Sequence, residues 1–418
     1  MTLINIFLIT AFLDGIMAGL TFLFFAYFRK VDPISMPDDQ LPFISVVVPA
    51  RNEGTKIRRC IESLANQNYP NYEVVVINDR STDDTGEIIR EIADKYQHVR
   101  MVQGQEAPAG WIGKCNALVT GMKFVSNNGK WLLFTDADTC HTPESLRLAM
   151  SYAMKHNAEL ISFMPVQELG SFWERAVMPV LLGSFLCGDP MNTINDRTND
   201  RAYAYGQYIL VRRDVYEAVG GHHSVFDQIL DDISFARVVK EHGYHIMAAE
   251  GRPLYKVRMY TDLESLWQGW TKNLYALIEC NFVYLVLVTV LINMAVVGPF
   301  VQAVYCLWAA FSGEAGSQLP LMTGLTVLEL ALLYAWYRRT AEHYEGVGPQ
   351  HFLLLPLGSL TVSALYAHSA WLVLSKHKVS WKGRKYLVNT SKAIEEEGAL
   401  SITASSQPVP AAPTDPNA

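Results

Sequence analysis

Two aspartates separated by one residue follow a short apolar run near the middle of the chain. Leu132–Phe134 and Thr135 precede Asp136 and Asp138. Apolar runs that end abruptly in charge are typical of buried parallel strands, whose carboxyl ends open onto ligand sites in α/β sheets. Paired carboxylates there offer hard oxygen ligands for Mg²⁺ or Mn²⁺ carrying a diphosphate. Alone, such a pair more often marks a solvated turn, so its meaning depends on the segments around it.

Three upstream segments also end in groups that could bind a nucleotide. Val46–Glu53 is an apolar strand followed by a polar loop, and Val76–Thr85 ends a second strand at Asp79. The Asp79 carboxylate could accept from a base N–H or a ribose hydroxyl. In Trp111–Leu118, Lys114 starts a helix and could meet phosphate. Two common nucleotide sites are excluded: the spacing before Lys114 is too short for a Walker A loop, and no Gly-x-Gly-x-x-Gly follows the first strand.

Alternating strands and helices must position these groups. Between about residues 40 and 165 the pattern predicts βαβ units and a parallel sheet. The expected strands are Ile44–Val48, Glu73–Ile77, Val99–Val102, Trp131–Phe134 and Glu159–Phe163, and the expected helices are 54–66, 83–96, 114–126 and 143–155. Beyond residue 165 the rhythm breaks, and the apolar segment 168–187 fits either a helix in the membrane interface or a core helix.

Further downstream the chain carries Gly206-Gln207 and the acidic pair Asp231-Asp232. With these segments it resembles the family-2 glycosyltransferases of the GT-A fold across about residues 42–252. The hydrophobic segments and the motif Trp381–Tyr386 near the C-terminus extend this resemblance. The whole arrangement is most similar to the hopanoid- and carotenoid-associated transferases. Ceramide glucosyltransferases are more distant relatives.

The resemblance implies a role for each matching position. The implied donor-binding residues are Pro49, Ala50, Arg51, Asn52, Glu53, Asp79, Gly113, Lys114 and Asp136; the metal ligands are Asp138 and Asp136; Gly206 and Gln207 lie on the acceptor side; and Asp232 and Asp231 are catalytic.

Three departures from the family pattern limit this transfer. Asn78 stands where many members have an aspartate, and Asp231 replaces a glutamate, which leaves the general base open between Asp231 and Asp232. One of these two is also expected to cap the helix Ile233–Glu241. The Gln-x-x-Arg-Trp motif of processive synthases is absent, and Trp267–Asn273 stands in its region, which weakens a processive interpretation.

The composition indicates a membrane protein. The chain has 418 residues, of which 50% are hydrophobic, and its mean hydropathy is +0.11. The excess lies in four segments, 3–28, 281–311, 319–336 and 351–375. The first is predicted to be an uncleaved anchor, because it lacks a basic n-region and a small-residue cleavage site.

Basic residues predict the orientation. Arg29-Lys30 follows the first segment, so the positive-inside rule places the large domain in the cytoplasm. The basic run Lys376–Lys385 should also be cytoplasmic, which requires one hydrophobic segment to be re-entrant or interfacial. Pro356 makes 351–375 the first candidate. The six cysteines show no metal-ligand spacing and suit thiols in a reducing compartment.

The expected architecture is an α/β protein: a GT-A doubly wound, mostly parallel sheet in the cytoplasm, with one N-terminal and two or three C-terminal transmembrane helices. The expected parts are an anchor (1–30), the glycosyltransferase domain (40–252), an interfacial connector (253–280), a transmembrane region (281–375), a basic cytoplasmic segment (376–392) and a disordered tail (393–418).

The expected function is that of a metal-dependent, inverting hexosyltransferase at the inner membrane. It would move a sugar from a nucleotide-sugar donor to the hydroxyl of a lipid acceptor, with Mg²⁺ or Mn²⁺ as cofactor. A processive polysaccharide synthase and a non-catalytic membrane scaffold remain alternatives. Nucleic acid is not expected as a partner, because the net charge is −7 and no basic cluster is interleaved with aromatic residues.

Overall fold

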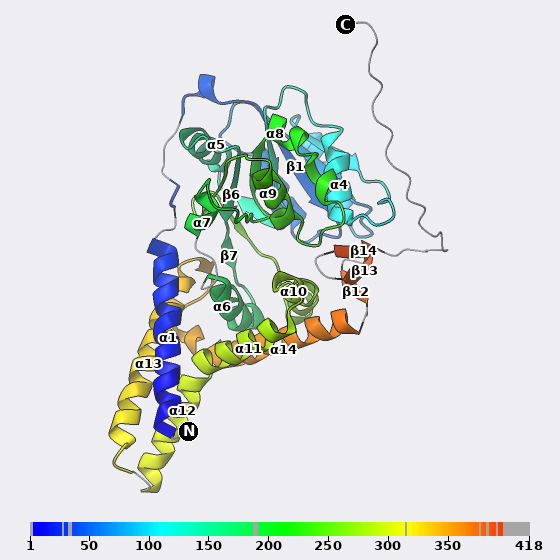
Figure 1. The fold of residues 1–418 in the computed structure, drawn as a ribbon. Coiled ribbons are helices and arrows are strands. Elements are labelled where there is room, and N and C mark those ends of the chain that lie inside the picture. Colours follow the sequence, from blue (N-terminus) through cyan, green and yellow to red (C-terminus); the bar gives the residue numbers. More distant parts are fainter. Residues whose placement is uncertain are drawn as a thin grey trace, which may run out of the picture.

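The computed structural model describes residues 3–26, 29–31, 36–186, 191–313, 316–375, 378–381, 384–389 and 392–395. They form three tiers (Figure 1): an α/β domain, a layer of helices lying across beneath it, and a group of upright helices that points away from the domain.

A seven-stranded sheet forms the centre of the α/β domain. Its order is β3-β2-β1-β4-β8-β6-β9. The strands are β1 (Ile44–Ala50), β2 (Tyr72–Asn78), β3 (Val99–Gln103), β4 (Trp131–Phe134), β6 (Leu160–Met164), β8 (Ile209–Arg212) and β9 (Ile246–Glu250). All neighbours are parallel except β8, which pairs antiparallel with both β4 and β6. The predicted mostly parallel α/β sheet is therefore confirmed, and the break in rhythm after residue 165 corresponds to the insertion of β8.

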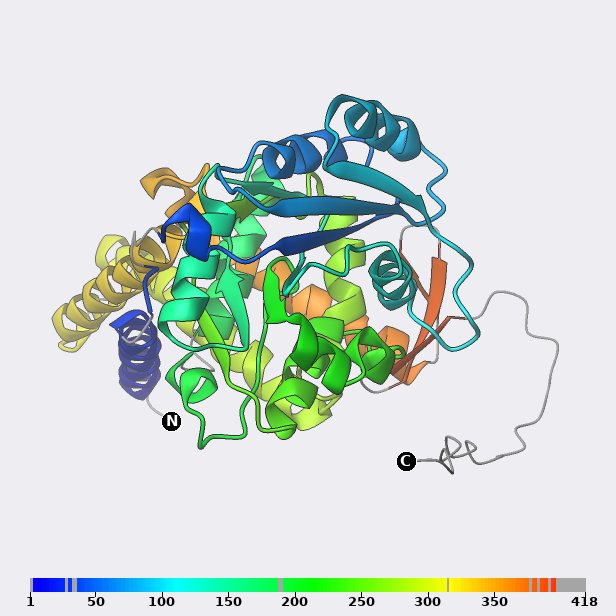
Figure 2. The ribbon, with the colours of Figure 1, turned by 90° about the horizontal axis from the view of Figure 1, so that it is seen from above.

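Helices cover both faces of this sheet (Figure 2). Successive side chains of a strand point to opposite faces, so Val46 and Val48 of β1 belong to one apolar core and Val47 to the other. The first core is closed by α2 (Ile57–Ala65), α3 (Thr85–Lys95) and α5 (Ser145–Lys155). The second is closed by α4 (Gly113–Met122), α8 (Arg213–Ala218) and α9 (Asp231–Glu241), with α7 (Met191–Asn195) beside β9.

A second sheet joins the α/β domain to the helices below. Its order is β11-β7-β10-β5, made by β5 (Thr139–His141), β7 (Val166–Glu168), β10 (Tyr255–Val257) and β11 (Tyr344–Glu345). β11 lies in the connection between two long helices of the membrane region, and it pairs with β7 of the α/β domain. The two parts of the protein therefore share a sheet.

The crosswise layer consists of α6 (Phe172–Leu186), α10 (Leu263–Leu277), α11 (Phe282–Val296) and α14 (Leu355–Leu374). α14 crosses α6 at very short range. The crossing needs a glycine at position 358, since a Cβ there would lie 1.9 Å from the Ala176 carbonyl oxygen. Val177, Val180 and Leu181 of α6 are buried in the core of this layer. Residues 168–187 are expected from the sequence to form either a helix in the membrane interface or a core helix. The burial of this apolar face fits the core helix.

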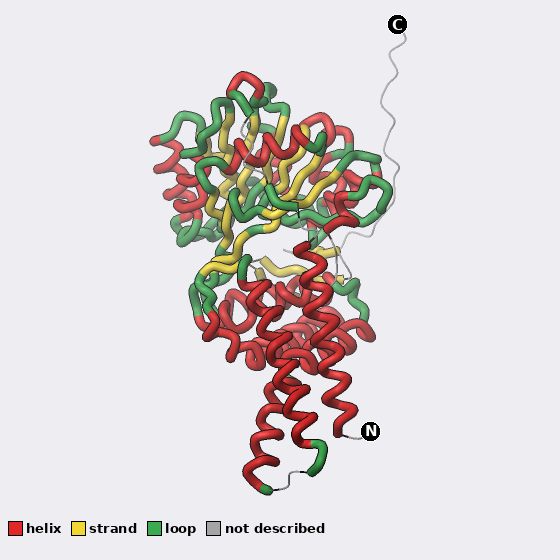
Figure 3. The backbone as a smooth tube through the Cα atoms, turned by 90° about the vertical axis from the view of Figure 1, so that its left-hand side faces the viewer, coloured by secondary structure: helices red, strands yellow, loops and turns green. Residues whose placement is uncertain are grey.

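The upright group consists of α1 (Leu3–Ala26), α12 (Gly298–Ser312) and α13 (Leu319–Ala341), which stand side by side in Figures 1 and 3. Three helices of the described chain are long and apolar enough to cross a membrane: Leu3–Phe25, Leu319–Ala341 and Pro349–Leu374. The third, which contains α14, runs across the direction of the other two (Figure 1). The expected segment 281–311 is divided at Val297 into α11 and α12.

The basic C-terminal segment adds a small antiparallel sheet of β12 (Lys378–Trp381), β13 (Arg384–Asn389) and β14 (Lys392–Glu395). It lies beside α10, on the side of the α/β domain (Figure 1). The expected disordered tail 393–418 lies outside the described residues from position 396 onward.

Candidate functional site

A cavity of about 260 Å³ opens where β1, β2 and β4 end. It brings together side chains from most of the predicted site segments. The predicted residues that line it are Pro49, Ala50, Arg51, Glu53, Asp79, Lys114, Asp136, Asp138, Gln207, Asp231 and Asp232. Its other lining residues are Ile112, Ala137, Ile229, Leu230, Met259, Tyr260, Gly269, Lys272 and Asn273.

The loops after β1 and β2 form one connected wall of this cavity. The backbone N–H of Asp79 donates to the Ala50 carbonyl at 2.8 Å, and Arg51 Nη1 donates to the Asp79 carbonyl at 2.9 Å. Asn52 has φ 51°, and its Oδ1 accepts from the Thr82 N–H at 2.9 Å. Asn52 therefore joins the two loops but does not line the cavity.

A polar network behind β4 holds the turn that carries Asp136. Thr139 Oγ1 donates to the Asp136 carbonyl at 2.8 Å. His141 Nε2 lies 3.1 Å from Thr139 Oγ1 and 3.2 Å from Thr135 Oγ1, which itself donates to the Gln207 carbonyl at 2.7 Å. Burial lowers the pKa of His141 to about 3, so the ring is neutral. Sequence reasoning missed this support, because isolated threonines and a lone histidine form no recognisable spacing.

Lys114 joins carboxylates from two distant parts of the chain. Its Nζ lies 3.0 Å from Asp136 Oδ1 and 3.4 Å from Asp231 Oδ2. Burial disfavours the ammonium, but the nearby Asp136 and Asp231 carboxylates outweigh this effect and raise the pKa of Lys114 above its ordinary value. Lys114 is consequently a permanent positive charge between the Asp136 turn and the start of α9.

Asp232 is held by two backbone N–H groups. Gly206 N–H donates to Asp232 Oδ2 and Ile233 N–H to Oδ1, both at 2.9 Å. Burial, together with the neighbouring Asp231 charge, raises the pKa of Asp232 to about 6. The expected cap is not formed by either aspartate, because α9 begins at Asp231 itself and Leu230 occupies the N-cap position.

Gly206 acts through its backbone and does not line the cavity. A Cβ at this position would lie 2.8 Å from Asp232 Oδ2. Any side chain would therefore push the carboxylate away from the N–H that orients it. The predicted acceptor-side pair thus separates into Gly206, which holds Asp232, and Gln207, which lines the cavity.

The membrane-side wall of the cavity is made by α10 and the residues just before it. Lys272 adds a third cation to Arg51 and Lys114, and Asn273 Oδ1 is buried with no hydrogen-bond partner among the described residues. Trp267 lies on α10 away from the cavity lining, and its Nε1 donates to His368 Nδ1 of α14 at 2.7 Å. Sequence reasoning noted Trp267–Asn273 only as the replacement for an absent motif, and it overlooked the polar residues at the end of this stretch.

The family model described as Glycosyl transferase family 2 matches residues 45–220. Residues 45–220 are a family-2 glycosyltransferase domain. The sheet of this domain is mostly parallel, as the resemblance to the GT-A fold predicts. The matched range includes the predicted donor-side residues from Pro49 to Asp136, the predicted metal ligand Asp138 and the acceptor-side pair Gly206-Gln207, and it ends before Asp231 and Asp232.

Other known proteins resemble the chain over a longer stretch than the glycosyltransferase domain. The 4,4'-diaponeurosporenoate glycosyltransferase of Staphylococcus aureus (strain USA300) is 25% identical over 360 residues, which cover 83% of this chain and 88% of that protein. A mannosyltransferase from Pyrobaculum calidifontis, solved with GDP-Man and Mn²⁺, is 18% identical with a TM-score of 0.48 and covers 87% of this chain and 99% of its own. TarS 1–349 of S. aureus, solved with UDP-GlcNAc, is 16% identical with a TM-score of 0.39, covering 85% and 99%.

The paired carboxylates of the glycosyltransferase domain fit a divalent cation that arrives with its substrate. Asp136 and Asp138 both line the cavity. Within the described ranges, no group of three or more His, Cys, Asp or Glu side chains could hold a metal ion. Mg²⁺ does not need such a cage, since it commonly binds one or two carboxylates together with substrate phosphates. The donor set therefore suits a metal ion whose remaining ligands come from a diphosphate.

One further predicted donor residue lies beside the cavity. Gly113 is the first residue of α4 and is buried next to Lys114 and Ile112, both of which line the cavity. Lys114, the next residue of the helix, reaches Asp136. Gly113 therefore belongs to the element that positions Lys114.

Proposed function

We propose that this protein is an inverting glycosyltransferase that moves a sugar from a nucleotide-sugar donor to the hydroxyl of a membrane lipid. One observation carries the proposal: Asp136 and Asp231 meet at Lys114 in a single cavity whose membrane-side wall is α10. Groups suited to a diphosphate and groups suited to an acceptor proton therefore share one space, and that space borders the helices.

Asp232 is the proposed general base. As the acceptor oxygen bonds to the anomeric carbon, its proton passes to the Asp232 carboxylate, and the bond from that carbon to the diphosphate oxygen breaks. With a pKa near 6, the Asp232 carboxylate is mostly deprotonated at neutral pH yet remains a useful base. Asp231 is less suited to this role because it is ion-paired with Lys114. A single displacement without an enzyme nucleophile inverts the anomeric centre.

The donor side is proposed to bind the nucleotide diphosphate. The loop Pro49–Glu53 and Asp79 would contact the nucleoside, while Lys114 and Lys272 would place positive charge near the phosphate oxygens. Mg²⁺ or Mn²⁺ held by Asp136 and Asp138 would supply Lewis-acid stabilisation of the leaving diphosphate.

The protein is proposed to be a multi-pass inner-membrane protein with its catalytic domain in the cytoplasm. Arg29 and Lys30 follow α1, and Arg338 and Arg339 lie in the last turn of α13, just before the strand that pairs with β7. Both basic pairs thus lie at the catalytic end of the upright helices, as the positive-inside rule requires of a cytoplasmic side. The crosswise course of α14 supports the placement of Lys376–Lys385 on the same side (Figure 1).

The test is a transfer assay with the full chain purified in detergent and returned to lipid vesicles. Radiolabelled nucleotide sugars are offered one at a time with a lipid extract, and products are identified by mass spectrometry and by the anomeric coupling in NMR. We expect a single sugar on a lipid, with inverted configuration, and at least about 100-fold slower transfer by Asp232→Asn. Asp94→Asn, an exposed aspartate of α3, is the matched control. Release of free sugar without glycolipid, or a retained configuration, would contradict the proposal.

A further inference from the structure

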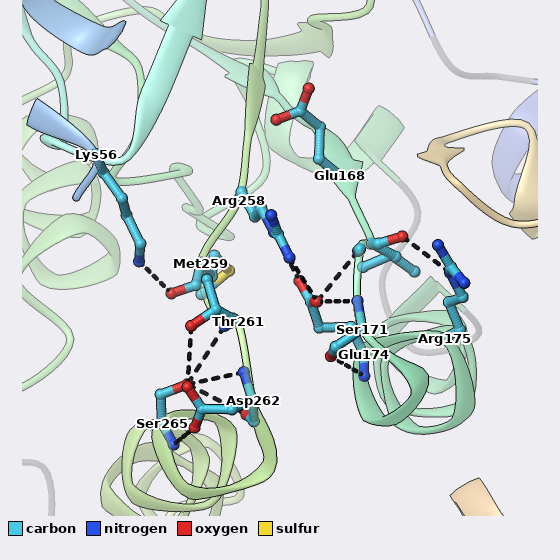
Figure 4. A network of polar contacts seen from close by, with 12 residues as sticks. Lys56, Glu168, Ser171, Glu174, Arg175, Arg258, Met259, Thr261, Asp262 and Ser265 are labelled. Atoms are coloured by element: carbon cyan, nitrogen blue, oxygen red, sulfur yellow. Dashed lines mark hydrogen bonds and ion pairs between the residues drawn. The ribbon is translucent and has the colours of Figure 1, made fainter. Parts of the chain in front are cut away.

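A short strap, residues 258–262, links the active site to two helices of the crosswise layer (Figure 4). The strap leaves β10 after Val257 and enters α10 at Leu263. Met259 and Tyr260, in its middle, line the catalytic cavity. The strap is therefore both part of the cavity wall and the connection to the membrane side.

The upper end of the strap is bonded to the catalytic domain. The backbone N–H of Arg258 donates to the Asp138 carbonyl at 3.3 Å, so the strap begins directly beside one of the paired carboxylates. Lys56, the N-cap residue of α2, donates from its Nζ to the Met259 carbonyl at 2.9 Å. These bonds fix where Met259 enters the cavity.

The lower end of the strap forms the capping box of α10. Asp262 Oδ1 accepts from the Ser265 N–H at 2.8 Å, while Ser265 Oγ accepts from the Asp262 N–H at 3.4 Å. Gly269, one turn further, has no room for a Cβ, which would lie 2.4 Å from the Tyr260 ring. The positions of Tyr260 and α10 are thus tied to each other.

The side chain of Arg258 reaches the start of the other helix, α6. Its Nη2 lies 3.3 Å from Glu174 Oε2, and the Glu174 side chain is only 2% exposed. Glu174 also accepts from the N–H groups of Ser171 (2.5 Å) and Gly170 (3.1 Å), so it closes the first turn of α6. A Cβ on Gly170 would lie 2.2 Å from Arg258 Nη2, which shows how closely the guanidinium fits there.

We propose that Arg258 is a positioning residue for the transfer reaction: by binding Glu174, it holds the strap and its Met259–Tyr260 wall at a fixed place relative to α6. The proposal rests on the proposed function, since it concerns where a lipid acceptor meets the donor. Without the pair, the strap keeps its bonds to Asp138, Lys56 and α10 but loses its connection to α6. The wall can then shift, and a bound acceptor loses its alignment with the anomeric carbon.

Water as an acceptor distinguishes positioning from general damage. A lipid hydroxyl must be held in line with the anomeric carbon, and a misplacement of about 1 Å can cost about 100-fold in rate. A water molecule that hydrolyses the donor needs no such wall. Loss of positioning should therefore lower lipid transfer more than donor hydrolysis.

The experiment compares Arg258→Gln with the wild-type chain in vesicles. We expect kcat for lipid transfer to fall about 10- to 100-fold, while donor hydrolysis and the donor dissociation constant change less than about twofold. Arg258→Lys should recover part of the loss, since an ammonium reaches Glu174 as a point charge. Glu174→Gln should reproduce the defect, and the double variant Arg258→Gln/Glu174→Gln should be no worse than either single one.

Arg59→Gln is the matched control. Arg59 forms an ion pair with Glu168 of the neighbouring β7 but does not line the cavity, so its removal should leave the transfer-to-hydrolysis ratio unchanged. If transfer and hydrolysis fall equally in Arg258→Gln, the positioning role is wrong. It is also wrong if the transfer-to-hydrolysis ratio is unchanged in both Arg258→Lys and Glu174→Gln. If the wild-type chain makes no glycolipid, the proposed function itself fails.

Discussion

The cavity of the α/β domain and the upright helices both contain acidic side chains, and the surroundings of these acids differ. In the cavity, Asp136 and Asp231 share the Lys114 ammonium at 3.0 and 3.4 Å. Their side chains remain 27% and 11% exposed, so substrate can reach them. These acids are paired with a cation and accessible.

Among the upright helices, Asp14 of α1 and Glu329 of α13 are fully buried. Glu329 Oε1 accepts from Thr10 Oγ1 at 2.9 Å, and Thr10 accepts from Gln302 Nε2 of α12 at 2.6 Å. Within the described residues, Asp14 has no hydrogen-bond partner for either carboxylate oxygen. Glu329 is thus bonded to a hydroxyl group, and neither acid forms an ion pair with a cation among the described residues.

Acidic side chains therefore have different roles in the two regions. A carboxylate beside Lys114 is ion-paired and lies in a cavity that a substrate can enter. Polar side chains between membrane helices instead bond across the interface and specify which helices pack together. We therefore expect that replacing a carboxyl group by an amide slows transfer when the group lies in the cavity. The same replacement between the helices should have little effect on transfer.

The strongest test of this contrast is Asp232→Asn, which removes the proposed base. We expect kcat for lipid transfer to fall roughly 100- to 10,000-fold, with little change in donor binding, because the base acts only as the acceptor proton moves. Steady-state kinetics and donor titration calorimetry measure the two quantities. Should Asp231→Asn show this profile while Asp232→Asn does not, the roles of the neighbours are reversed.

Removal of the metal ligand comes next. Asp138→Asn should lose most turnover while the protein stays folded, because one hard oxygen ligand of the proposed Mg²⁺ or Mn²⁺ becomes an amide. Chelation by EDTA should abolish wild-type transfer, and added Mg²⁺ or Mn²⁺ should restore it. Circular dichroism controls for folding. Full activity in EDTA would disprove the metal role and leave Lys114 as the main counter-charge.

A smaller effect is expected from pH. Because the pKa of Asp232 is raised to about 6, its base form is protonated as the pH falls through that value. Transfer should therefore drop about tenfold between about pH 7 and about pH 5 and level off above neutrality. A kcat profile over this range, with donor at saturation, measures the effect. A rate independent of pH in that window would argue against a carboxylate base.

The smallest effect on activity is expected between the helices. Asp14→Asn combined with Glu329→Gln replaces both carboxyl groups by amides of the same size, so transfer should stay within about twofold of wild type. Glu329→Leu, which leaves Thr10 and Gln302 without this acceptor, should lower the free energy of unfolding in detergent by about 1–3 kcal/mol. A loss of turnover in the amide pair as large as that of Asp232→Asn would erase the contrast between the two regions.

Much of the fold could be predicted from local pattern. Apolar runs such as Val46–Val48 and Leu132–Phe134 can only be satisfied inside a sheet covered on both faces, and the strands lie where the pattern put them. β8 was not predicted, because Ile209–Arg212 is short and its antiparallel insertion between β4 and β6 leaves no trace in periodicity. Its place in the sheet also carries Gln207 to the cavity.

The cavity was predictable on its donor side only. Asp79 and Asp136 follow strands directly, so a parallel sheet must bring them to one edge. The membrane-side wall was not predictable, since Tyr260, Lys272 and Asn273 lie in a loop and a helix without any strand end to place them. Only the packing of Gly269 against Tyr260 and of α10 on α14 brings them there.

By itself, the sequence determined which residues stand at strand ends and which helices are apolar, because both follow from the chemistry of neighbouring residues. Only the tertiary structure decided that Lys114 joins Asp136 to Asp231, and that α14 lies across the upright helices. Periodicity within a helix carries no information about its angle to another. The course of α14 depends on contacts such as Gly358 against Ala176 of α6, between residues far apart in the chain.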